Sequence, residues 1–499
     1  MLLHHLLFWD KIKYMLEYTR EQLWQQFLPL FYPKSIAIVG VSHNPLKIGT
    51  LWLKGIIDAG FPGRIFPVNP RGGEIFGLKI LPSLRDIPEI VDYVIVTIPR
   101  ENVSGLLDDC AAKNVKAVHF FTAGFGELND VAGYRLESIL LEKARHGGFR
   151  IIGPNCIGVY CPEARVPYGP AGKIGKSGSV GFISQSGGIG EKLVELGFAR
   201  GIHYNKGISF GNGIDLDSAD FLQYMGVDPA VSVIGMYIEG TRDGRRLLKA
   251  MTTVAPVKPI VALKAGRTET GAVAARSHTG SLTSAAAIWS AMFRQCGVIE
   301  VHNIDEMADS LLIFQFLREW DGRGIAIIGG LIDGGGGISV TAGDVCAEHG
   351  LDVMPLTLET QQELSQLLGR VGSILHNPVD VSQANGNPAI IKKALELVIN
   401  DPNIDLTIIQ EDIGILHKYL PEVIVSEINA MFIDLKAKYH KPMVMVLPPG
   451  LAEAERGQIE QEFNKASIPV FPSMERAAKA IANLKYYSSF KQGLRNYND

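Results

Sequence analysis

The sequence predicts an α/β protein built from parallel sheets covered by helices. Short β-branched runs alternate with helix-length amphipathic stretches almost throughout the chain, a pattern typical of parallel strands joined by helical crossovers. The chain has 499 residues, and at roughly 150 residues per domain this length indicates about three domains, each able to bury a core. Hydrophobic residues make up 46% and charged residues 20% of the chain, which is a globular composition.

The N-terminal part is predicted to be a helical extension followed by a Rossmann-like domain. Residues 1–26 carry apolar side chains at helical spacing, which predicts an amphipathic helix or helix pair packed on the protein or on another subunit. The mixed charges of this segment argue against a role at a membrane surface. The first predicted domain spans residues 27–160, and its Rossmann-like unit ends near Val159. Its strands are expected at 35–39, 64–68, 93–97, 117–121 and 150–152.

A linker and two further domains are expected after the first domain. Residues 161–178 are rich in proline and glycine, break both periodicities and are predicted to be the linker. The second domain is expected over 179–321, with its last long helix ending near Trp320, and the third over 322–487, which leaves a tail at 488–499. The expected strands are 180–183, 206–209, 231–237 and 259–263 in the second domain, and 324–328, 407–409, 443–446 and 468–471 in the third.

Charge and cysteine content exclude several classes of function. Lys and Arg number 48 against 52 Asp and Glu, a net charge of −4 without long runs of either sign, which leaves no electrostatic footprint for nucleic acid. The five cysteines form neither CxxC pairs nor a disulfide framework, which predicts reduced thiols, a cytoplasmic location and no structural metal site. The apolar N-terminus is too short to span a bilayer and lacks a basic start, so neither a signal peptide nor a membrane helix is predicted.

The loops that follow the predicted strands are the first candidates for a site, because ligands of doubly wound sheets bind beyond the carboxyl ends of the strands. The loop from Gly40 to Gly49 is rich in small residues, which lets backbone N–H groups and a helix N-terminus approach a phosphate. It lacks the GxGxxG pattern, and tight strand–helix packing explains such a loop as well. After the next strand, Val68 and Asn69 precede Arg71, which either meets a second phosphate or is an ordinary surface arginine.

Two further glycine clusters stand between a strand and a helix, one in each of the later domains. Ser186, Gly187 and Gly188 open a helix of the second domain. The third-domain cluster contains Gly334, Gly335 and Gly336. A helix N-terminus binds anions through its free N–H groups and the helix dipole. Two clusters in equivalent positions favour phosphate binding over close packing alone.

His278 is the candidate nucleophile of the chain. It lies in a polar loop, 275–281, among small and hydroxyl-bearing residues rather than on an apolar face. A neutral histidine nitrogen can attack a phosphoryl group and pass it on, although most histidines have no such role. This chemistry needs a carboxylate that fixes the ring. Glu239, after a predicted strand, is the candidate, and an ordinary loop glutamate is the alternative.

Nine motifs in order resemble those of the α subunit of ADP-forming acyl-CoA synthetases (acetate–CoA ligase, ADP-forming), within the NDP-forming superfamily that includes succinyl-CoA synthetase. The motifs are GVSHNP at 40–45, PVNPRG at 67–72, FTAGFGE at 121–127, GPNCIGV at 153–159, SQSGG at 184–188, SFGN at 209–212, YIEG at 237–240, RSHTGSL at 276–282 and NPVDV at 377–381. The resemblance extends over about residues 28–485.

The resemblance implies a CoA-binding Rossmann-like domain followed by two flavodoxin-like, succinyl-CoA synthetase-like ligase domains. It places the family's phosphorylated histidine at His278 and its orienting glutamate at Glu239. It also places the loop for the CoA nucleotide at residues 40–49, with Ser42 inside it, and the basic residue that approaches a CoA phosphate at Arg71.

The same resemblance assigns the surroundings of the phosphohistidine. Asn155 of the GPNC motif is placed beside the reacting centre. Two helices that hold the phosphohistidine are expected to begin at residues 186–188 and 334–337. Asp333 stands where relatives commonly have Asn, which weakens the second of these assignments because an anionic side chain disfavours phosphate.

The resemblance further implies an acid–thiol ligase that interconverts acyl-CoA, ADP and phosphate with carboxylic acid, CoA and ATP through an acyl phosphate. The family's ATP-grasp portion has no counterpart in the sequence, so ATP, ADP and Mg²⁺ are expected on an ATP-grasp β subunit within a hetero-oligomer. A non-catalytic CoA-binding or regulatory protein with the same fold is the alternative. A nicotinamide-dependent oxidoreductase is disfavoured because GxGxxG is missing.

Overall fold

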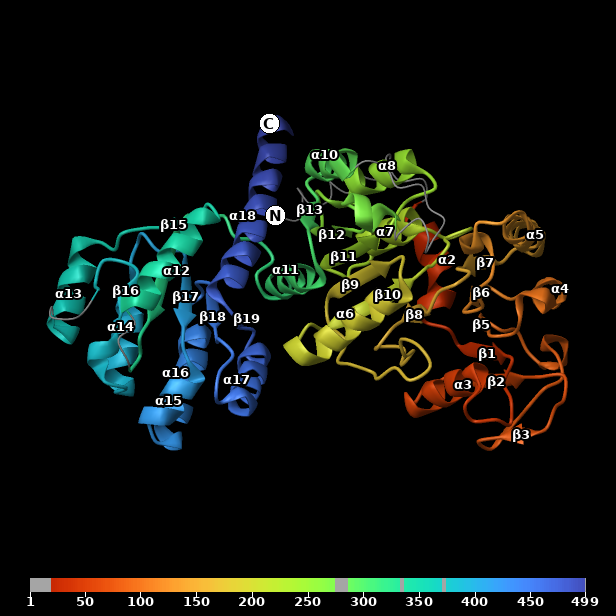
Figure 1. Ribbon diagram of the computed structural model, residues 1–499, viewed down its shortest axis with the longest axis horizontal. Coiled ribbons are helices and arrows are strands. Elements are labelled where there is room, and N and C mark those ends of the chain that lie inside the picture. Colours follow the sequence, from red (N-terminus) through yellow and green to blue (C-terminus); the bar gives the residue numbers. More distant parts are fainter. Residues whose placement is uncertain (1–18, 274–285, 333–335, 370–373, 499) are drawn as a thin grey trace. The chain divides into compact units, whose positions relative to one another are not determined.

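The computed structural model describes residues 19–273, 286–332, 336–369 and 374–498. The chain divides into two compact units, residues 1–198 with 202–307 and residues 199–201 with 308–499. Helices flank three large sheets that are parallel apart from one edge strand (Figure 1). The predicted α/β class is therefore confirmed.

The first sheet lies in the first unit and has the strand order β2-β1-β5-β6-β7, with all neighbours parallel. Its strands are β1 (Ser35–Val39), β2 (Arg64–Val68), β5 (Tyr93–Val96), β6 (Ala117–Phe120) and β7 (Arg150–Ile152). The helices are α3 (Ile48–Asp58), α4 (Val103–Ala112) and α5 (Val131–Gly147), and a small hairpin joins β3 (Glu74–Ile75) to β4 (Leu78–Lys79). Three short 3₁₀ turns are η1 (Leu84–Asp86), η2 (Arg100–Asn102) and η3 (Gly126–Leu128).

The core of this sheet explains why its strands were recognisable in the sequence. All residues of β1 and β5 are buried, because helices cover both faces of a parallel sheet. On one face Val39, Val96 and Leu107 pack in a single cluster. After β1 the chain adds β2 on one side of this strand and then β5 on its other side. The switch point of the sheet therefore lies between β1 and β5.

The second sheet also lies in the first unit and has the order β13-β12-β11-β9-β10-β8. Its strands are β8 (Gly158–Tyr160), β9 (Val180–Ser184), β10 (Tyr204–Ser209), β11 (Val233–Ile238), β12 (Ile260–Lys264) and β13 (Ile299–Val301). The helices are α6 (Gly187–Arg200), α7 (Ser218–Val227), α8 (Gly244–Val254) and α10 (Ala286–Cys296). The switch point of this sheet lies between β9 and β11.

Strand β8 comprises the last three residues of the predicted first domain but belongs to the second sheet. It pairs antiparallel with β10 at the edge of the second sheet, with Val159 opposite Ile208. Its pairing partner lies about fifty residues further along the chain, which local sequence does not encode. The GPNC motif, which precedes β8, therefore bridges the two sheets of this unit.

Helix α2 (Arg20–Phe31) accounts for part of the predicted N-terminal helix and extends beyond residue 26. Thr19 and Gln22 form a capping box at its start, which satisfies backbone N–H groups there. Phe27 and Phe31 stack on Tyr224 of α7, with ring centroids 4.7 and 5.2 Å apart. This helix is therefore packed on the second sheet's helices, as expected for a packed extension; residues 1–18 lie outside the described part of the chain.

The second unit contains the third sheet, with the order β15-β14-β17-β18-β19 and β16 paired to β14. Its strands are β14 (Gly324–Gly329), β15 (Asp352–Val353), β16 (Val379–Asp380), β17 (Leu406–Gln410), β18 (Met443–Val446) and β19 (Val470–Phe471). The helices, beginning with one that crosses the division between the units, are α11 (Ile304–Phe316), α12 (Gly336–Glu348), α13 (Leu358–Leu368), α14 (Pro388–Asn400), α15 (Ile413–Tyr419), α16 (Glu422–Lys438), α17 (Glu453–Lys465) and α18 (Met474–Asn498). A further 3₁₀ turn is η4 (Ser382–Ala384).

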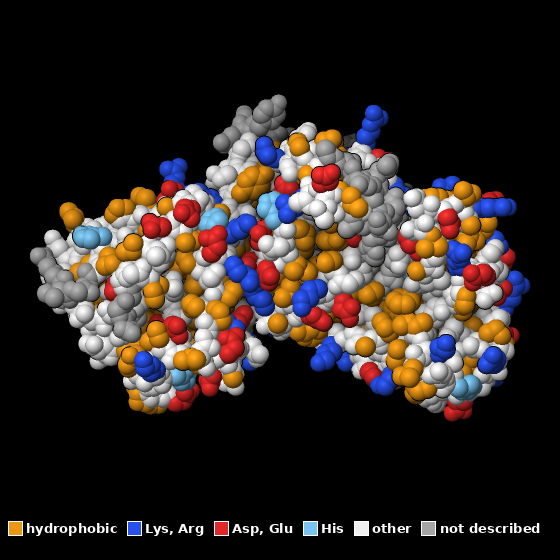
Figure 2. Space-filling view, viewed as in Figure 1, with side chains coloured by type: hydrophobic (Ala, Val, Ile, Leu, Met, Phe, Trp, Pro, Cys, Tyr) orange, Lys and Arg blue, Asp and Glu red, His pale blue; other side chains and the backbone are white. Residues whose placement is uncertain are grey.

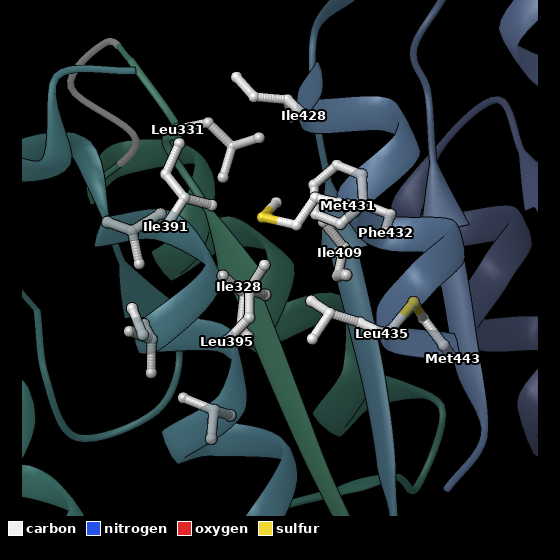
Figure 3. Packing of buried hydrophobic residues seen from close by; sticks show 14 of the residues in the cluster. Ile328, Leu331, Ile391, Leu395, Ile409, Ile428, Met431, Phe432, Leu435 and Met443 are labelled. Carbon is white, nitrogen blue, oxygen red and sulfur yellow. The ribbon is translucent and has the colours of Figure 1, made fainter. Parts of the chain in front are cut away.

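The core of the second unit forms where one face of this sheet meets α14 and α16. Figure 3 shows Ile328 of β14 and Ile409 of β17 beside Leu395 of α14 and Phe432 of α16. All four side chains are completely buried. Burying apolar surface stabilises such a layer by about 25 cal/mol per Å², which fixes the carboxyl ends of the strands that carry the loops.

Charged side chains of both signs are intermingled on the face seen in Figure 2. Within the described ranges, no helix is long and apolar enough to cross a membrane. In the same ranges, no three His, Cys, Asp or Glu side chains gather in an arrangement that could hold a metal ion.

Candidate active site

Two glycines shape the loop between β1 and α3. Gly40 has φ of 107°, and a Cβ there would lie 2.5 Å from Oγ1 of Thr97, which follows β5. A Cβ at Gly49 would lie 2.4 Å from the carbonyl oxygen of Gly40. Only glycine fits either position, so the first turn of α3 is held against the loop at the switch point. No side chain caps the N-terminus of α3 at Lys47, which leaves backbone donors for an anion.

The loop after β2 lies against the loop after β1. The side-chain amide of Asn69 donates to the carbonyl of Val41 at 2.6 Å, and its Oδ1 accepts from the backbone N–H of Arg71 at 2.9 Å. A Cβ at Gly73 would lie 2.7 Å from Nε2 of His43. The Arg71 side chain is exposed. The structure therefore brings together the predicted residues of the two loops, from Gly40 to Gly49 and from Val68 to Arg71.

Ser42 has a structural role in the first of these loops. Its backbone N–H donates to Oγ1 of Thr50 at 3.0 Å, and the Thr50 hydroxyl donates to its carbonyl at 2.6 Å. Its own hydroxyl accepts from the backbone N–H of Asn44 at 3.2 Å. Thr50 ties the loop to the first turn of α3, a contribution that sequence reasoning missed.

At the switch point of the second sheet, Gln185 joins the two candidate loops. Its Oε1 accepts hydrogen bonds from the backbone N–H groups of Glu239, at 2.9 Å, and Gly240, at 3.0 Å. Its own N–H donates to the carbonyl of Tyr237 at 3.0 Å. The Glu239 loop is therefore fixed directly beside the SQSGG loop. Gln185 had no predicted role, and its position immediately after an apolar strand was the signal available.

Glu239 is a buried carboxylate with a buried cation nearby. The side chain is 4% exposed, and the Tyr237 hydroxyl donates to its Oε1 at 3.3 Å. Lys264, at the end of β12 and 2% exposed, donates from Nζ to the carbonyl of Glu239 at 2.8 Å and also to the carbonyl of Ala265. Its ammonium lies 5.3 Å from the ring centroid of Trp289. Lys264 was not predicted, although a lysine that ends a buried strand is itself an unusual pattern.

Burial controls the pKa values around Glu239. Burial lowers the pKa of Lys264 below its ordinary value, while the charge of Glu239 acts in the opposite direction. Burial raises the pKa of Tyr237, and the neighbouring Glu239 carboxylate raises it further. The tyrosine hydroxyl therefore stays protonated and can donate to the carboxylate.

The N-terminus of α6 forms the predicted cradle of the second sheet. Nothing lies within 4 Å of the position that a Cβ at Gly188 would occupy, so the first turn is open on that side. A Cβ at Gly190 would lie 2.0 Å from the hydroxyl oxygen of Tyr168, and this hydroxyl donates to the carbonyl of Gly187 at 3.0 Å. Ser186 caps the turn, because its Oγ accepts from Ile189 N–H at 3.5 Å. Tyr168 lies in the predicted linker, which therefore contributes to the cradle.

Asn155 stands where the two sheets meet. It has φ of 58°, is partly buried, and donates its backbone N–H to the carbonyl of Thr122 at 3.1 Å. A Cβ at Gly211 would lie 2.3 Å from the carbonyl oxygen of Asn155. Ile157 lies two residues after Asn155, and its Cγ1 would be 2.9 Å from a Cβ placed at Gly187. The structure therefore brings the GPNC motif next to the α6 cradle.

The buried ring of His119 contacts the backbone of the GPNC motif. Its ring is fully buried, and Nε2 lies 3.0 Å from the carbonyl oxygen of Cys156. The ring stacks on Tyr93 at 6.0 Å between centroids and meets Trp52 edge-on at 5.6 Å. Burial lowers the pKa of His119 to about 4, although the bond to the Cys156 carbonyl acts in the opposite direction.

Acidification should therefore destabilise the first unit through His119. Between pH 6.5, the ordinary pKa of histidine, and about pH 4, the unfolded chain binds a proton at His119 that the folded chain does not. The stability that the neutral ring contributes is therefore fully present above pH 6.5 and is lost as the pH falls toward 4. A shift from pH 7.5 to pH 5 should lower the free energy of unfolding by about 2 kcal/mol through this group. Urea unfolding at both pH values should give a flatter profile for His119→Phe, and identical profiles would contradict the assignment.

In the second unit, the described part of the third cradle is the first turn of α12. A Cβ at Gly336 would lie 3.7 Å from Oδ2 of Asp380, a buried carboxylate of the NPVDV motif that accepts from Ser382 N–H at 2.9 Å. This carboxylate is a second acidic group near the predicted cradle. Three other predicted residues, His278, Gly334 and Gly335, lie outside the described residues, as does Asp333.

Fold and candidate site together define an α/β protein with three large sheets whose strands are mostly parallel. Three family models match in chain order. These are a CoA binding domain at residues 34–162, a succinyl-CoA ligase like flavodoxin domain at 177–314 and a ligase-CoA domain at 329–492. The predicted fold, a CoA-binding domain followed by two ligase-type domains, is confirmed.

Relatives of known name cover nearly the whole chain. The α subunit of ADP-forming acetate–CoA ligase I of Pyrococcus furiosus is 35% identical, and the match covers 93% of this chain and 98% of the relative. ADP-forming acetate–CoA ligase I of Archaeoglobus fulgidus is 34% identical over 76% of this chain and 54% of the relative. The chain belongs to the family of ADP-forming acyl-CoA synthetase α subunits, which are acid–thiol ligases, and the predicted function class is confirmed over its non-catalytic alternative.

A solved structure has the same fold over almost the full length. The dinucleotide-forming acetyl-coenzyme A synthetase 1 of Ca. Korarchaeum cryptofilum, in complex with phosphate and ADP, has a TM-score of 0.83 and 29% identity. The match covers 94% of this chain and 98% of that chain. CoA is accordingly the expected thiol substrate of the first domain.

Proposed function

We propose that this chain binds CoA and carries a phosphoryl group between an acyl phosphate and a nucleoside diphosphate. The observation that carries this proposal is the meeting of Glu239, Gln185, the α6 N-terminus and the GPNC motif at one sheet edge, each through a contact given above. The His278 loop begins eleven residues after the Lys264 strand end that holds the Glu239 carbonyl. In sequence, His278 therefore follows β12, the strand that pairs with β11.

In the proposed reaction a phosphate oxygen attacks the thioester carbonyl carbon, the carbon–sulfur bond breaks, and CoA leaves with acyl phosphate formed. His278 then attacks the phosphorus, and the phosphorus–oxygen bond breaks to release the carboxylate. Finally a terminal oxygen of ADP attacks the phosphorus and the phosphorus–nitrogen bond breaks. Glu239 orients the His278 ring and stabilises its charge, Asn155 lies beside the acyl group, and residues 186–188 hold the phosphate through N–H donors.

The remaining assignments complete this proposal. Residues 27–160 form the CoA-binding domain, 179–321 the phosphohistidine domain and 322–487 the second ligase domain. The third cradle, at residues 334–336, receives the phosphoryl group when the loop moves. We propose that ATP, ADP and Mg²⁺ are bound by an ATP-grasp β subunit, a proposal supported by the name of the Pyrococcus furiosus relative as a subunit alpha.

CoA is proposed to bind at the switch point of the first sheet, with its phosphates on the loop from Gly40 to Gly49 and near Arg71. No side chain caps the N-terminus of α3, which leaves backbone N–H donors there for a phosphate. The exposed Arg71 is tethered by Asn69 at its backbone, so its guanidinium is free to meet a second phosphate.

Arg71→Ala should weaken CoA binding by about 1.5 to 3 kcal/mol, the loss expected for a charge-assisted contact. Calorimetric titration of the full chain with CoA measures this loss. Arg135→Ala, an exposed arginine of α5 that lies outside both loops, is the matched control and should bind CoA like wild type. Equal affinity in wild type and Arg71→Ala would remove Arg71 from the site.

A further inference from the structure

Glu137 is a buried carboxylate of α5 that no step of the proposed reaction uses. Its side chain is 4% exposed although α5 covers the outside of the first sheet. Its Oε1 accepts from the backbone N–H of Gly126 at 3.2 Å and from the side-chain amide of Asn212 at 2.8 Å. Its Oε2 accepts from Nη2 of Arg242 at 2.9 Å. A carboxylate loses hydration on burial and is stable there only with such partners.

A second carboxylate completes the cluster. Glu127 accepts from the backbone N–H of Phe125 at 3.1 Å, and its Oε2 accepts from the amide of Asn212 at 2.6 Å. Arg242 also donates from Nε to the carbonyl of Asn212 at 3.2 Å. The side-chain amide of Asn212 therefore donates to two carboxylates, and the backbone carbonyl of Asn212 accepts from the Arg242 guanidinium. We name Glu137, Glu127, Asn212 and Arg242 the Glu137 clamp.

The clamp joins the two sheets of the first unit at the proposed site. Glu127 follows β6 and Glu137 lies on α5, both in the first sheet's domain, whereas Asn212 follows β10. Arg242 is three residues after Glu239, in the loop that follows β11. The clamp therefore holds the Glu239 loop through Arg242, while Gln185 holds the same loop through the backbone N–H groups of Glu239 and Gly240.

The clamp also reaches the GPNC motif. The backbone N–H of Asn212 donates to the carbonyl of Pro154 at 3.0 Å. The neighbouring Gly211 packs so closely on the Asn155 carbonyl that a Cβ at Gly211 would lie 2.3 Å from its oxygen. A shift of Asn212 therefore moves the backbone on which Asn155 stands. None of the clamp residues belongs to the loops proposed for CoA, at residues 40–49 and 68–71.

We infer that Glu137 is a positioning residue, which fixes the Glu239 loop and the GPNC backbone through Arg242 and Asn212 so that phosphoryl transfer proceeds in the correct geometry. This inference rests on the proposed role of Glu239. A displacement of about 1 Å at a reacting centre can cost roughly 10²-fold in rate. Loss of the clamp is therefore expected to slow phosphorylation and to leave CoA affinity unchanged.

The test is the rate at which the full chain acquires label from radioactive phosphate and acyl-CoA, with acetyl-, propionyl- and butyryl-CoA as probes. Glu137→Gln keeps the shape of the side chain but removes its charge, and should slow labelling at least about 10-fold. Its calorimetric CoA affinity should stay within about twofold, because the CoA loops are separate from the clamp. Arg242→Gln, at a side chain that is half exposed, tests the same link from the other partner and keeps a side-chain amide that can donate to Glu137.

Asp215→Asn is the matched control. Asp215 binds the Arg150 guanidinium of β7 through two contacts of 2.9 Å and so also links the two sheets, but neither Arg150 nor Ile151, which its carboxylate also binds, belongs to the clamp. It should label within about twofold of wild type, since the hydrogen bonds of its carboxylate to Arg150 and Ile151 involve no clamp residue. Equal slowing in Asp215→Asn and Glu137→Gln would overturn the inference in favour of general loosening between the sheets.

The remaining outcomes separate this inference from the proposed function. Glu239→Gln that labels slowly, together with Glu137→Gln and Arg242→Gln that label at the wild-type rate, would overturn the inference alone. Absence of label in wild type with every probe would overturn the proposed function and this inference with it. Slower labelling in both clamp variants with unchanged CoA affinity would support the inference.

Discussion

His278→Ala should abolish the acid-labile, base-stable phosphoryl label that wild type acquires from acyl-CoA and phosphate. A phosphoramidate on histidine has this stability pattern, whereas an acyl phosphate on Asp or Glu is lost in base. An alanine offers no nitrogen to the phosphorus, so the loss should be complete rather than partial. His146→Ala, at the exposed end of α5, is the matched control and should label normally. A fully labelled His278→Ala chain would exclude this histidine as the carrier.

Glu239→Gln tests the orienting carboxylate in the same assay. Glutamine keeps an oxygen for the Tyr237 hydroxyl and leaves the backbone bonds to Gln185 and Lys264 in place. What it loses is the charge that stabilises a protonated or phosphorylated imidazole. Labelling should fall by roughly 10²-fold or more, by analogy with other buried histidine orienters. Labelling at the wild-type rate would show that Glu239 does not act on His278.

Much of the fold was predictable because its strands are buried on both faces. The run expected at 35–39 coincides with β1, whose residues are all buried, since uninterrupted apolar sequence is the signature of a covered parallel strand. Strands of two or three residues, such as β8 and β16, have no such signature and were missed. The antiparallel pairing of β8 with β10 depends on a contact across some fifty residues, which local sequence does not encode.

The candidate site was predictable where its chemistry is local. The glycines at 40 and 49 and the cluster at 186–188 follow strands directly, so strand order alone brings them to the correct edges. Gln185 and Lys264 were missed because their partners in the Glu239 loop lie on other strands. Glu137 was missed for the same reason, since its bonds to Asn212 and Arg242 cross from one sheet to another.

The isolated chain should make no ATP from acyl-CoA, ADP and phosphate, although it should phosphorylate itself from acyl-CoA and phosphate alone. Each of the three large sheets in the described part of the chain has its switch-point loops assigned to CoA or to phosphate in the proposal. None of these assignments leaves loops for ADP beside His278. Adding the ATP-grasp subunit should therefore restore turnover by supplying the final phosphoryl acceptor.

The two half-reactions make this expectation decisive. A chase of the isolated phosphorylated chain with ADP and Mg²⁺ should leave the label on the protein, whereas the same chase with the partner present should transfer it to ATP within a single turnover. The partner alone, mixed with acyl-CoA and phosphate, is the control and should acquire no label. Robust ATP synthesis by the homogeneous chain would refute the division of labour. It would require that one of the loops assigned to CoA or phosphate binds the nucleotide instead, because a diphosphate must stand in line with the phosphorus–nitrogen bond that breaks.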